Sequence, residues 1–368
     1  MKYNRLGQSG LFVSEYCLGT PGFVSGGPDG VSLETVGSEE RSRAILNAAL
    51  DRGVNFIDTA DYYGMGQSED MIGRILGARR RDVVIATKAG LRVGRGLNDA
   101  GLSRRHLIAS VEGSLQRLGT DWIDLFIVHR VDPYTPLEET LQALDDVVRQ
   151  GKVRYIGYSN WPAWLASKAV MLQRHHGWAR FIAAQLYYSL LGREIEHDSI
   201  ALAEDAGIGI MAWSPLANGF LTGKYTGGDP TGGNGRLAHF TLGPLDRVKG
   251  DRVVGVLREI AERRGATPAQ IALAWVARQR AVASVLIGVS DLAQLQSNLP
   301  EPAPVLDDRD MAALEQASAI PAAYPEWYNA MMADDAAAHA LEGRYDPATT
   351  PVGMDAYPRF YLGREPAR

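Results

Sequence analysis

Cysteine is almost absent from this sequence of 368 residues, which contains only Cys17. A single cysteine excludes a disulfide framework and a cysteine-based metal site within one chain. Cys17 lies in the apolar run Tyr16-Cys17-Leu18, which is typical of a strand. A catalytic thiol needs an activating base, whereas a free cysteine in an apolar run is usually buried. We therefore expect Cys17 to be a structural residue of the core.

Long apolar runs and a surplus of basic charge are missing as well. No stretch of about 18 uncharged apolar residues occurs, so no membrane span is expected. The N-terminal sequence MKYNRLGQSGLFVS lacks the apolar segment of a signal peptide, which predicts a cytoplasmic location. The formal net charge is -5 without a basic tract, which argues against nucleic acid or anionic membrane as the main partner. Apart from the adjacent His175-His176, no histidine, cysteine or aspartate cluster has metal-ligand spacing, so no metal is expected.

Short β-rich runs alternate with longer helical patterns along most of the chain. Continuous apolar runs are typical of parallel strands that are covered on both faces, and the helical spacers predict βαβ crossovers. Eight such units predict a (β/α)₈ TIM barrel, with an N-terminal β-hairpin over Tyr3–Phe12 that closes its bottom. A doubly wound open sheet is the alternative. The strands are expected near Tyr16–Leu18, Asn55–Asp58, Val83–Thr87, Ile123–Val128, Tyr155–Tyr158, Phe181–Gln185, Gly209–Trp213 and Ser284–Ile287.

Capping signals predict where several helices begin and end. Ser103 is expected to cap one helix, and Thr135, followed by Pro136 and Glu138, is expected to cap another that stops at Gly151. The same arrangement recurs at Thr267-Pro268-Ala269-Gln270.

Three segments fall outside this alternation. The glycine-rich segments Pro21–Gly37 and Tyr225–Gly250 follow the first and seventh barrel strands, at the face where barrel active sites are built. The third segment is a tail rich in Ala and Asp that also carries large apolar side chains. We expect a barrel over residues 1–318 and a tail over residues 319–368 that packs on the barrel, with the surroundings of the active site as one place for it. A flexible tail is the alternative.

Polar residues stand at the carboxyl ends of successive strands. Asp58 ends the second strand, Lys88 ends the third and His129 ends the fourth, while Tyr63 follows Asp58 by five residues. Polar residues at the mouth of a barrel are typical of catalysis. Singly, each has another interpretation: an Asp–Lys ion pair, a hydrogen-bonded packing histidine, or stacking between Tyr62 and Tyr63. The strand order of all four favours the catalytic interpretation.

These residue types suit the reduction of a carbonyl group. Such a reduction needs a hydride at carbon and a proton at oxygen, and a tyrosine can give the proton although its usual pKa is about 10. A nearby Lys⁺ stabilises tyrosinate and lowers that pKa. We therefore expect Asp58 to support Lys88, Lys88 to tune Tyr63, and a neutral His129 to position the substrate.

The sequence resembles the aldo-keto reductase family over roughly residues 3–318. The matching segments are Gly53–Gly64, Ser68-Glu69, Thr87-Lys88, Asp124-Leu125 with His129, Gly157–Asn160, Gln185, Trp213–Leu216, Gly219–Tyr225 and Ile287–Asn298. The resemblance implies a (β/α)₈ barrel, a nicotinamide cofactor bound without a Rossmann domain, and Asp58, Tyr63, Lys88 and His129 as the catalytic tetrad.

The resemblance also implies cofactor contacts. These contacts include Asp58 as well as Gly19 and Thr20, which lie after the first strand. Ser159, Asn160 and Gln185 match residues that bind the carboxamide, and Trp213 matches the stacking aromatic. Ser214, Pro215, Leu216, Gly219 and Lys224 match the loop around the pyrophosphate, and Gly288, Ser290, Gln294 and Asn298 match the adenosine end.

The adenosine end departs from the family pattern. The family commonly places Arg or Lys after the eighth strand to grip the 2′-phosphate of NADP, whereas Gly288–Gln294 has no basic residue and one acidic residue, Asp291. Serine and glutamine can bind a phosphate but do not neutralise it. We expect NADP(H) as cofactor with weak discrimination against NAD(H).

The expected partner is a small-molecule carbonyl or alcohol, and the sequence does not determine the oligomeric state. Phe23, Val24 and Trp161 predict an apolar wall around Tyr63 and His129, which favours a bulky ketone or secondary alcohol. The alternative function is that of a regulatory subunit resembling potassium-channel β subunits, which share the barrel, tetrad and cofactor. Because the hairpin begins at about Tyr3, with no room for an inactivating extension, we favour an enzyme.

Overall fold

The computed structural model of the chain describes residues 1–25, 36–225, 245–352 and 356–357. Contacts divide the chain into two units, Met1–Ala319 and Ile320–Arg368. Most of the two glycine-rich segments predicted after the first and seventh barrel strands lies outside the described residues.

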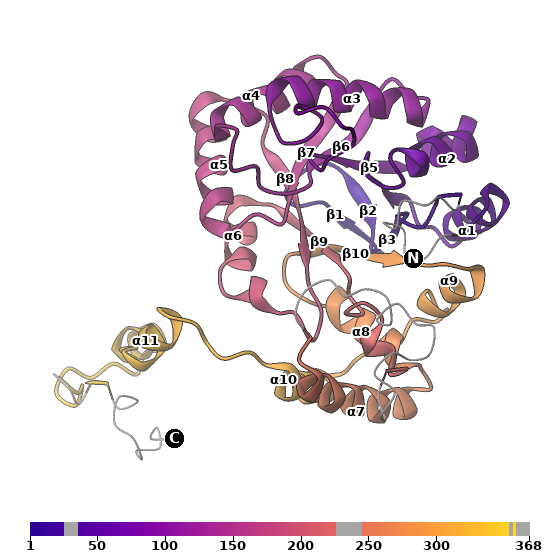
Figure 1. The fold of residues 1–368 in the computed structure, drawn as a ribbon. Helices are drawn as coiled ribbons and strands as arrows, with labels where there is room; N and C mark the ends of the chain where they lie inside the picture. The colour runs from indigo at the N-terminus through magenta and orange to yellow at the C-terminus, as the bar shows by residue number, and fades with distance from the viewer. Residues whose placement is uncertain (26–35, 226–244, 353–355, 358–368) are drawn as a thin grey trace. The chain divides into compact units, whose positions relative to one another are not determined.

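The first unit is built on a closed barrel of eight parallel strands (Figure 1). Each strand pairs with the next one along the chain, and the last pairs with the first, so no edge stays open. This order confirms the predicted barrel and makes the alternative of an open doubly wound sheet wrong. The strands are β3 (Tyr16–Gly19), β4 (Phe56–Asp58), β5 (Val84–Ala89), β6 (Ile123–Val128), β7 (Val153–Ser159), β8 (Phe181–Tyr187), β9 (Gly209–Trp213) and β10 (Val282–Gly288).

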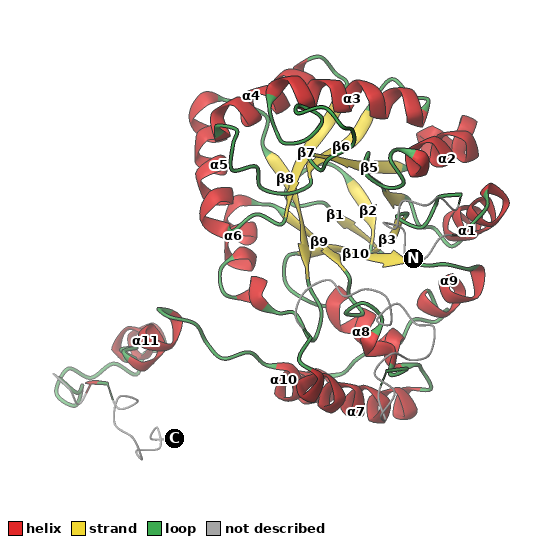
Figure 2. Ribbon diagram, in the orientation of Figure 1, coloured by secondary structure: helices red, strands yellow, loops and turns green. Residues whose placement is uncertain are grey.

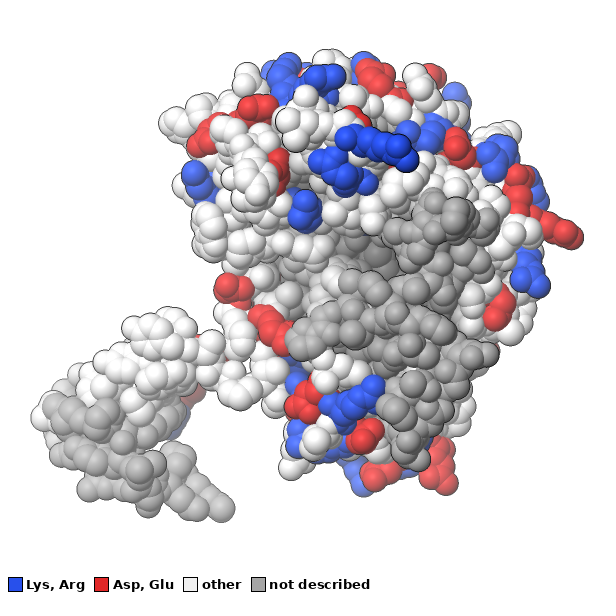
Figure 3. All heavy atoms as spheres, in the orientation of Figure 1, with Lys and Arg blue, Asp and Glu red and all other residues white. Residues whose placement is uncertain are grey.

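Helices surround the barrel (Figure 2). Buried residues form two hydrophobic clusters, one inside the barrel and one between the barrel and the helices. Alternate strand residues such as Phe56 and Leu125 face the interior, whereas Ile57 and Phe126 pack against the helices, as the two-residue period of a strand requires. The helices are α1 (Glu39–Asp51), α2 (Gln67–Leu76), α3 (Arg104–Leu118), α4 (Leu137–Arg149), α5 (Ala163–His176), α6 (Ser199–Ala206), α7 (Arg247–Arg264), α8 (Pro268–Ala277), α9 (Leu292–Asn298) and α10 (Asp308–Ser318). Basic and acidic side chains are interspersed around them (Figure 3).

The predicted N-terminal hairpin closes the bottom of the barrel. Its strands are β1 (Tyr3–Arg5) and β2 (Phe12–Ser14), which pair antiparallel. Leu6 and Val13 are fully buried in the interior cluster. Gly7 has a φ of 60°, and a Cβ placed on it would lie 2.3 Å from the carbonyl oxygen of Gly207, so only glycine fits here.

The helix caps follow the sequence in two places and depart from it in one. Ser103 accepts a hydrogen bond from the amide of His106, and Thr267 forms a reciprocal capping box with Gln270, as predicted. The prediction that Thr135 caps α4 is wrong, since Pro136 occupies the cap position and makes no side-chain bond. The helix begins at Leu137, one residue too late for Thr135 to be its cap, and the Thr135 hydroxyl donates instead to Asp132 Oδ2 at 2.6 Å.

Cys17 is fully buried in the interior cluster, which confirms the prediction of a structural cysteine. Burial raises the pKa of its thiol well above the usual value. Within the described residues, no helix is long and apolar enough to cross a membrane. The same part of the chain holds no group of three or more His, Cys, Asp or Glu side chains arranged for a metal ion.

Among its described residues, the second unit contains two short helices, α11 (Glu326–Met331) and α12 (Ala336–Leu341). The rings of Tyr324 and Trp327 lie 6.0 Å apart and those of Trp327 and Tyr328 lie 6.1 Å apart, so its aromatic residues contact one another. Packing of this tail on the barrel stays a prediction.

Candidate active site

The barrel brings Asp58, Lys88 and His129 to one end. Asp58 is the last residue of β4, Lys88 stands next to the end of β5, and His129 directly follows β6. These strands are parallel neighbours, so their carboxyl ends meet at the same mouth. Tyr63 lies in the loop between β4 and α2, with the centroid of its ring 4.7 Å from Lys88 Nζ. The structure therefore places the four predicted catalytic side chains together.

Lys88 and Asp58 form a fully buried ion pair at 2.7 Å. The Lys88 ammonium also donates to the carbonyl oxygen of Thr59 at 2.7 Å. Burial, the largest single effect, lowers the pKa of Lys88, but the charge and hydrogen bond of Asp58 and the neighbouring Tyr63 together outweigh burial and raise this pKa above its usual value. The amine is therefore charged at neutral pH.

Tyr63 keeps its proton at neutral pH. Burial raises the pKa of its phenol, and the charge of Lys88 lowers that pKa only in part, so the net shift is upward. The lowering of the Tyr63 pKa that the sequence predicts from Lys88 is therefore outweighed by burial, which a sequence does not display. A protonated phenol beside a cation is suited to give its proton away and to be stabilised as an anion afterwards.

His129 is neutral and faces Tyr63. The two rings lie 6.2 Å apart in an edge-to-face arrangement. Burial, helped by the charges of Lys88 and Arg130, lowers the pKa of His129 to about 3. Its Nδ1 is buried without a hydrogen-bond partner, which leaves Nε2 as the nitrogen that a ligand can reach.

A chain of hydrogen bonds links the tetrad to the neighbouring strand ends. Gln185 Nε2 donates to Asp58 Oδ1 at 2.6 Å, and Ser159 Oγ donates to the carbonyl oxygen of Gln185 at 2.8 Å. Asn160 Nδ2 donates to Ser159 Oγ at 2.8 Å, and Trp213 Nε1 donates to Asn160 Oδ1 at 3.0 Å. The sequence assigned these residues only to a ligand. Since a ligand-binding match does not reveal partners within the protein, the support that Gln185 gives to Asp58 was missed.

The loop after β9 combines unusual backbone geometry with one cation. Ser214 and Gly219 have positive φ angles of 53° and 86°. The Ser214 hydroxyl accepts from the amide of Asn218, and a Cβ placed on Gly219 would lie 3.8 Å from Lys224 Nζ. A turn with such backbone angles beside a lysine has the donor set that suits a diphosphate. Pro215 and Leu216 complete this loop.

The segment after β10 is held by its own side chains. Ser290 Oγ accepts from Gln294 Nε2 at 2.7 Å, and the Ser290 amide donates to Gln294 Oε1 at 3.1 Å. Asp291 caps α9 by accepting from the amide of Gln294, so this acid has a structural partner that the sequence argument did not consider. Gly288 ends β10 and Asn298 ends α9. The predicted adenosine-end residues thus lie on one short segment that runs from the end of β10 to the end of α9.

Several predicted ligand residues are buried. Gly19 ends β3, and the Thr20 hydroxyl donates to the carbonyl oxygen of Asp58 at 2.9 Å. Trp161 packs 5.7 Å from the ring of Tyr158 in the outer core. Phe23, Val24 and Trp161 are all buried, because large apolar groups near a barrel mouth can also pack between strands and helices. Their contact with a substrate remains a prediction.

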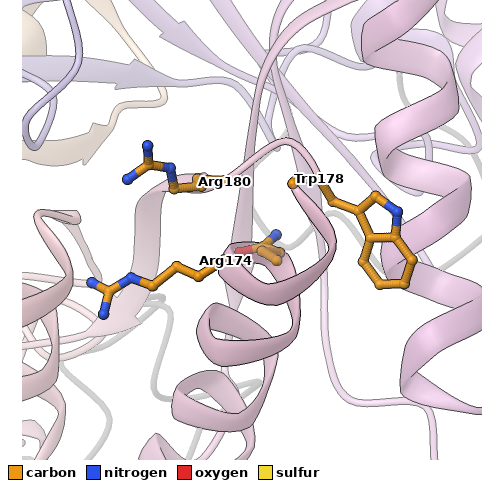
Figure 4. A pocket seen from close by; sticks show the side chains of 5 residues that line it. Arg174, Trp178 and Arg180 are labelled. Atoms are coloured by element: carbon orange, nitrogen blue, oxygen red, sulfur yellow. The ribbon is translucent and has the colours of Figure 1, made fainter.

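A separate hollow of about 270 Å³ lies where α5 meets β8. In Figure 4, Arg174 and Arg180 extend toward the same side, and Trp178 points away from them. The hollow adjoins Phe181, the first residue of β8, whereas Gln185 near the other end of that strand binds Asp58. It therefore lies away from the tetrad, and its lining is Gln173, Arg174, Gly177, Trp178 and Arg180.

Comparison with known sequences agrees with this geometry. The sequence model of the Aldo/keto reductase family matches residues 17–319. A protein of Aspergillus parasiticus named versiconal hemiacetal acetate reductase is 36% identical over 296 residues, which cover 75% of this chain and 85% of that protein. A putative voltage-gated potassium channel subunit beta of Schizosaccharomyces pombe is 36% identical over 303 residues, covering 80% and 86%. A probable subunit of the same kind from Oryza sativa subsp. japonica is 36% identical over 309 residues, covering 81% and 90%.

Proposed function

Since this chain belongs to the aldo/keto reductase family, we propose that it is an oxidoreductase that interconverts a carbonyl group and an alcohol with a nicotinamide cofactor. The observation that carries the proposal is the buried Lys88–Asp58 pair under the ring of Tyr63, with the neutral His129 opposite. The barrel fold alone would not support this proposal, because enzymes with this fold catalyse many different reactions.

In the proposed reaction Tyr63 is the acid. Its phenol gives the proton to the carbonyl oxygen of the substrate, and Lys88 stabilises the tyrosinate that results. Asp58 keeps the lysine charged and fixed, and Gln185 holds the second oxygen of that carboxylate. His129 Nε2 donates a hydrogen bond that orients the carbonyl oxygen toward Tyr63.

A nicotinamide cofactor fits the donor set at the mouth. When bound, it supplies the hydride for the carbonyl carbon. Asn160, which is exposed, and Trp213, which is partly exposed, would hold the nicotinamide end, and Lys224 beside Gly219 would hold the diphosphate. Because no Lys or Arg stands between Gly288 and Asn298, we propose that NADP(H) is used with weak discrimination against NAD(H).

For the substrate we propose a ketone or secondary alcohol of some bulk, with Val24 and Trp161 near the pocket. The relative named as a reductase of versiconal hemiacetal acetate supports a reductase. The test is a panel of aldehydes and ketones of graded size, followed by nicotinamide absorbance with NADPH and with NADH. Turnover restricted to small aldehydes would contradict the proposed substrate class.

A second candidate function is that of a regulatory subunit. Two relatives at 36% identity are named as potassium channel subunits beta, and they cover this chain slightly more fully than the reductase does. A regulatory subunit of this kind would bind the cofactor and turn over carbonyls at most very slowly. Binding of NADPH without turnover of any substrate in the panel would favour it over the enzyme.

A further inference from the structure

Asp61 is a buried acid that the proposed reaction does not use. It lies two residues before Tyr63, and its amide donates to the carbonyl oxygen of Lys88 at 3.1 Å. Its side chain is 3% exposed, and no hydrogen bond of ordinary geometry reaches either carboxylate oxygen. A buried carboxylate without donors is costly when charged, so its surroundings need an explanation.

The acid faces a second buried carboxylate, which is fully engaged. Glu69 on α2 is 0% exposed and accepts from Arg117 Nε at 2.7 Å and from the Thr87 hydroxyl at 2.5 Å. Thr87 directly precedes Lys88 on β5, and Arg117 lies on α3. The Glu69 carboxylate therefore ties the strand that carries the lysine to two outer helices.

The path of Arg117 depends on two glycines. A Cβ placed on Gly66, in the turn that follows Tyr63, would lie 2.5 Å from Arg117 Cδ. A Cβ placed on Gly113 would lie 2.9 Å from Arg117 Nη1. Arg117 thus packs closely against Gly66 in the turn that follows Tyr63. The position of this turn and the position of Arg117 therefore depend on each other.

The charged and polar groups that face Asp61 come from α2, from α3 and from the neighbouring backbone. Glu69 on α2 repels a charge there and Arg117 on α3 attracts it, while Ser110 on α3 and the amide of Tyr62 supply dipoles. Ser110 in turn lies 3.5 Å from His106 Nε2. Two carboxylates thus share one cation that already binds Glu69, and a second buried charge would have no partner of its own.

We propose that Asp61 is a positioning residue that holds the turn of Tyr63 in its active geometry as a neutral carboxylic acid, and that its ionisation loosens this turn. The pKa of Asp61 agrees with this, since burial first and Glu69 second raise it to about 8, against the opposing effects of Arg117, Ser110 and the Tyr62 amide. Because the backbone amide of Asp61 donates to the carbonyl oxygen of Lys88, a displacement of Asp61 would shift both Lys88 and Tyr63. The catalytic consequence rests on the proposed function, whereas the protonation and the loosening do not.

Thermal stability tests the protonation without any substrate. Asp61→Asn keeps the shape of the neutral acid and removes its ionisation. An acid whose folded pKa is raised stabilises the fold least above that pKa, so the wild type loses stability relative to the variant as pH rises from about 4 to about 8. The Tm advantage of Asp61→Asn should grow over this range and then level off, while the exposed control Asp51→Asn shows no such trend. A difference in Tm between the wild type and Asp61→Asn that does not change with pH would contradict the proposal that Asp61 is neutral.

Hydrogen exchange tests the positioning. Amide exchange of residues 59–66, corrected for its intrinsic pH dependence, should increase by about tenfold or more in the wild type between pH 7 and pH 9.5, because most of the Asp61 is ionised at the higher pH. Asp61→Asn should stay protected at both values. Equal exchange in the two proteins at pH 9.5 would show that ionisation does not loosen the turn.

The pH dependence of kcat tests whether the turn of Tyr63 affects the reaction. The kcat for carbonyl reduction should fall above about pH 8 in the wild type, whereas Asp61→Asn should hold its rate to higher pH with KM for the cofactor nearly unchanged. Identical pH profiles of kcat in the wild type and in Asp61→Asn would refute the proposed role of Asp61 in positioning the turn. A complete lack of turnover would refute the proposed function instead, and the Tm and exchange measurements would still decide the state of Asp61.

Discussion

For single residues, burial and nearby charges from several strands and helices set the protonation of the side chains at the barrel mouth. The sequence indicated Asp58, Lys88 and His129 because each lies at or beside the carboxyl end of an apolar strand, and these ends meet at the mouth of a barrel. The net rise in the pKa of Tyr63 could not be found, since burial comes from side chains that are distant in the sequence. The same holds for Asp61, whose neighbours Glu69 and Arg117 come from two different helices.

Removal of the Lys88 charge should lower both the turnover rate and the stability of the fold. Lys88→Met leaves Asp58 buried without its partner, and breaking a buried pair in this way costs about 3–5 kcal/mol. The kcat should fall by about 10²-fold or more, because tyrosinate loses the charge that stabilises it. Urea unfolding and steady-state kinetics measure the two effects, and Lys152→Met, at a partly exposed ion pair, is the control. A folded Lys88→Met protein with more than half of the wild-type kcat would refute the role of the lysine.

Cofactor preference should respond to a single residue after β10. Ser290→Arg adds a cation at the predicted 2′-phosphate position, and a charge-assisted contact of about 1.5–3 kcal/mol corresponds to roughly tenfold or more in affinity. The KM for NADPH should fall accordingly and the KM for NADH should stay nearly constant. Because Asp291 already caps α9, it competes less for the new arginine than its charge suggests. Gln296→Arg on α9 adds the same charge elsewhere, and equal effects of both variants would exclude a specific phosphate contact.

At the scale of the element, local signals predict the barrel well and individual caps less well. Thr135 and Thr267 have the same sequence context, a threonine before proline with Glu or Gln three residues after the threonine. Only Thr267 caps its helix, because α8 begins directly after Thr267, whereas α4 begins at Leu137, two residues after Thr135. Strand positions were predictable since a covered parallel strand is apolar along its whole length.

The closing hairpin should depend on the backbone of one glycine. Gly7→Ala adds a Cβ that would lie 2.3 Å from the carbonyl oxygen of Gly207, in a left-handed conformation that itself costs about 1–2 kcal/mol. We expect a loss of about 2 kcal/mol or more in the free energy of unfolding, measured with urea. Gly10→Ala in the same hairpin, where nothing lies within 4 Å, is the matched control. If both variants are equally stable, Gly7 does not constrain the closure of the barrel.

For the whole molecule, the order of the strands along the chain explains why the residues of the site meet at one end of the barrel. Each strand of the barrel neighbours the next, so Asp58, Lys88 and His129 converge without any long-range signal in the sequence. Residues of the later strands, such as Gln185, also reach the mouth, but their partners become visible only in three dimensions. The substrate follows from none of this, because loops set specificity in a barrel and a shared fold does not carry it.

We propose that this molecule reduces a carbonyl with Tyr63 as the proton donor. The most direct measurement is kcat for the best carbonyl substrate, together with the Kd for NADPH, in wild type and in Tyr63→Phe, with Tyr62→Phe as the neighbouring control. Removal of a general acid should lower kcat by about 10²–10⁴-fold, while the Kd for NADPH and the activity of Tyr62→Phe stay close to wild type. A Tyr63→Phe enzyme that keeps more than half of the wild-type kcat would contradict the account.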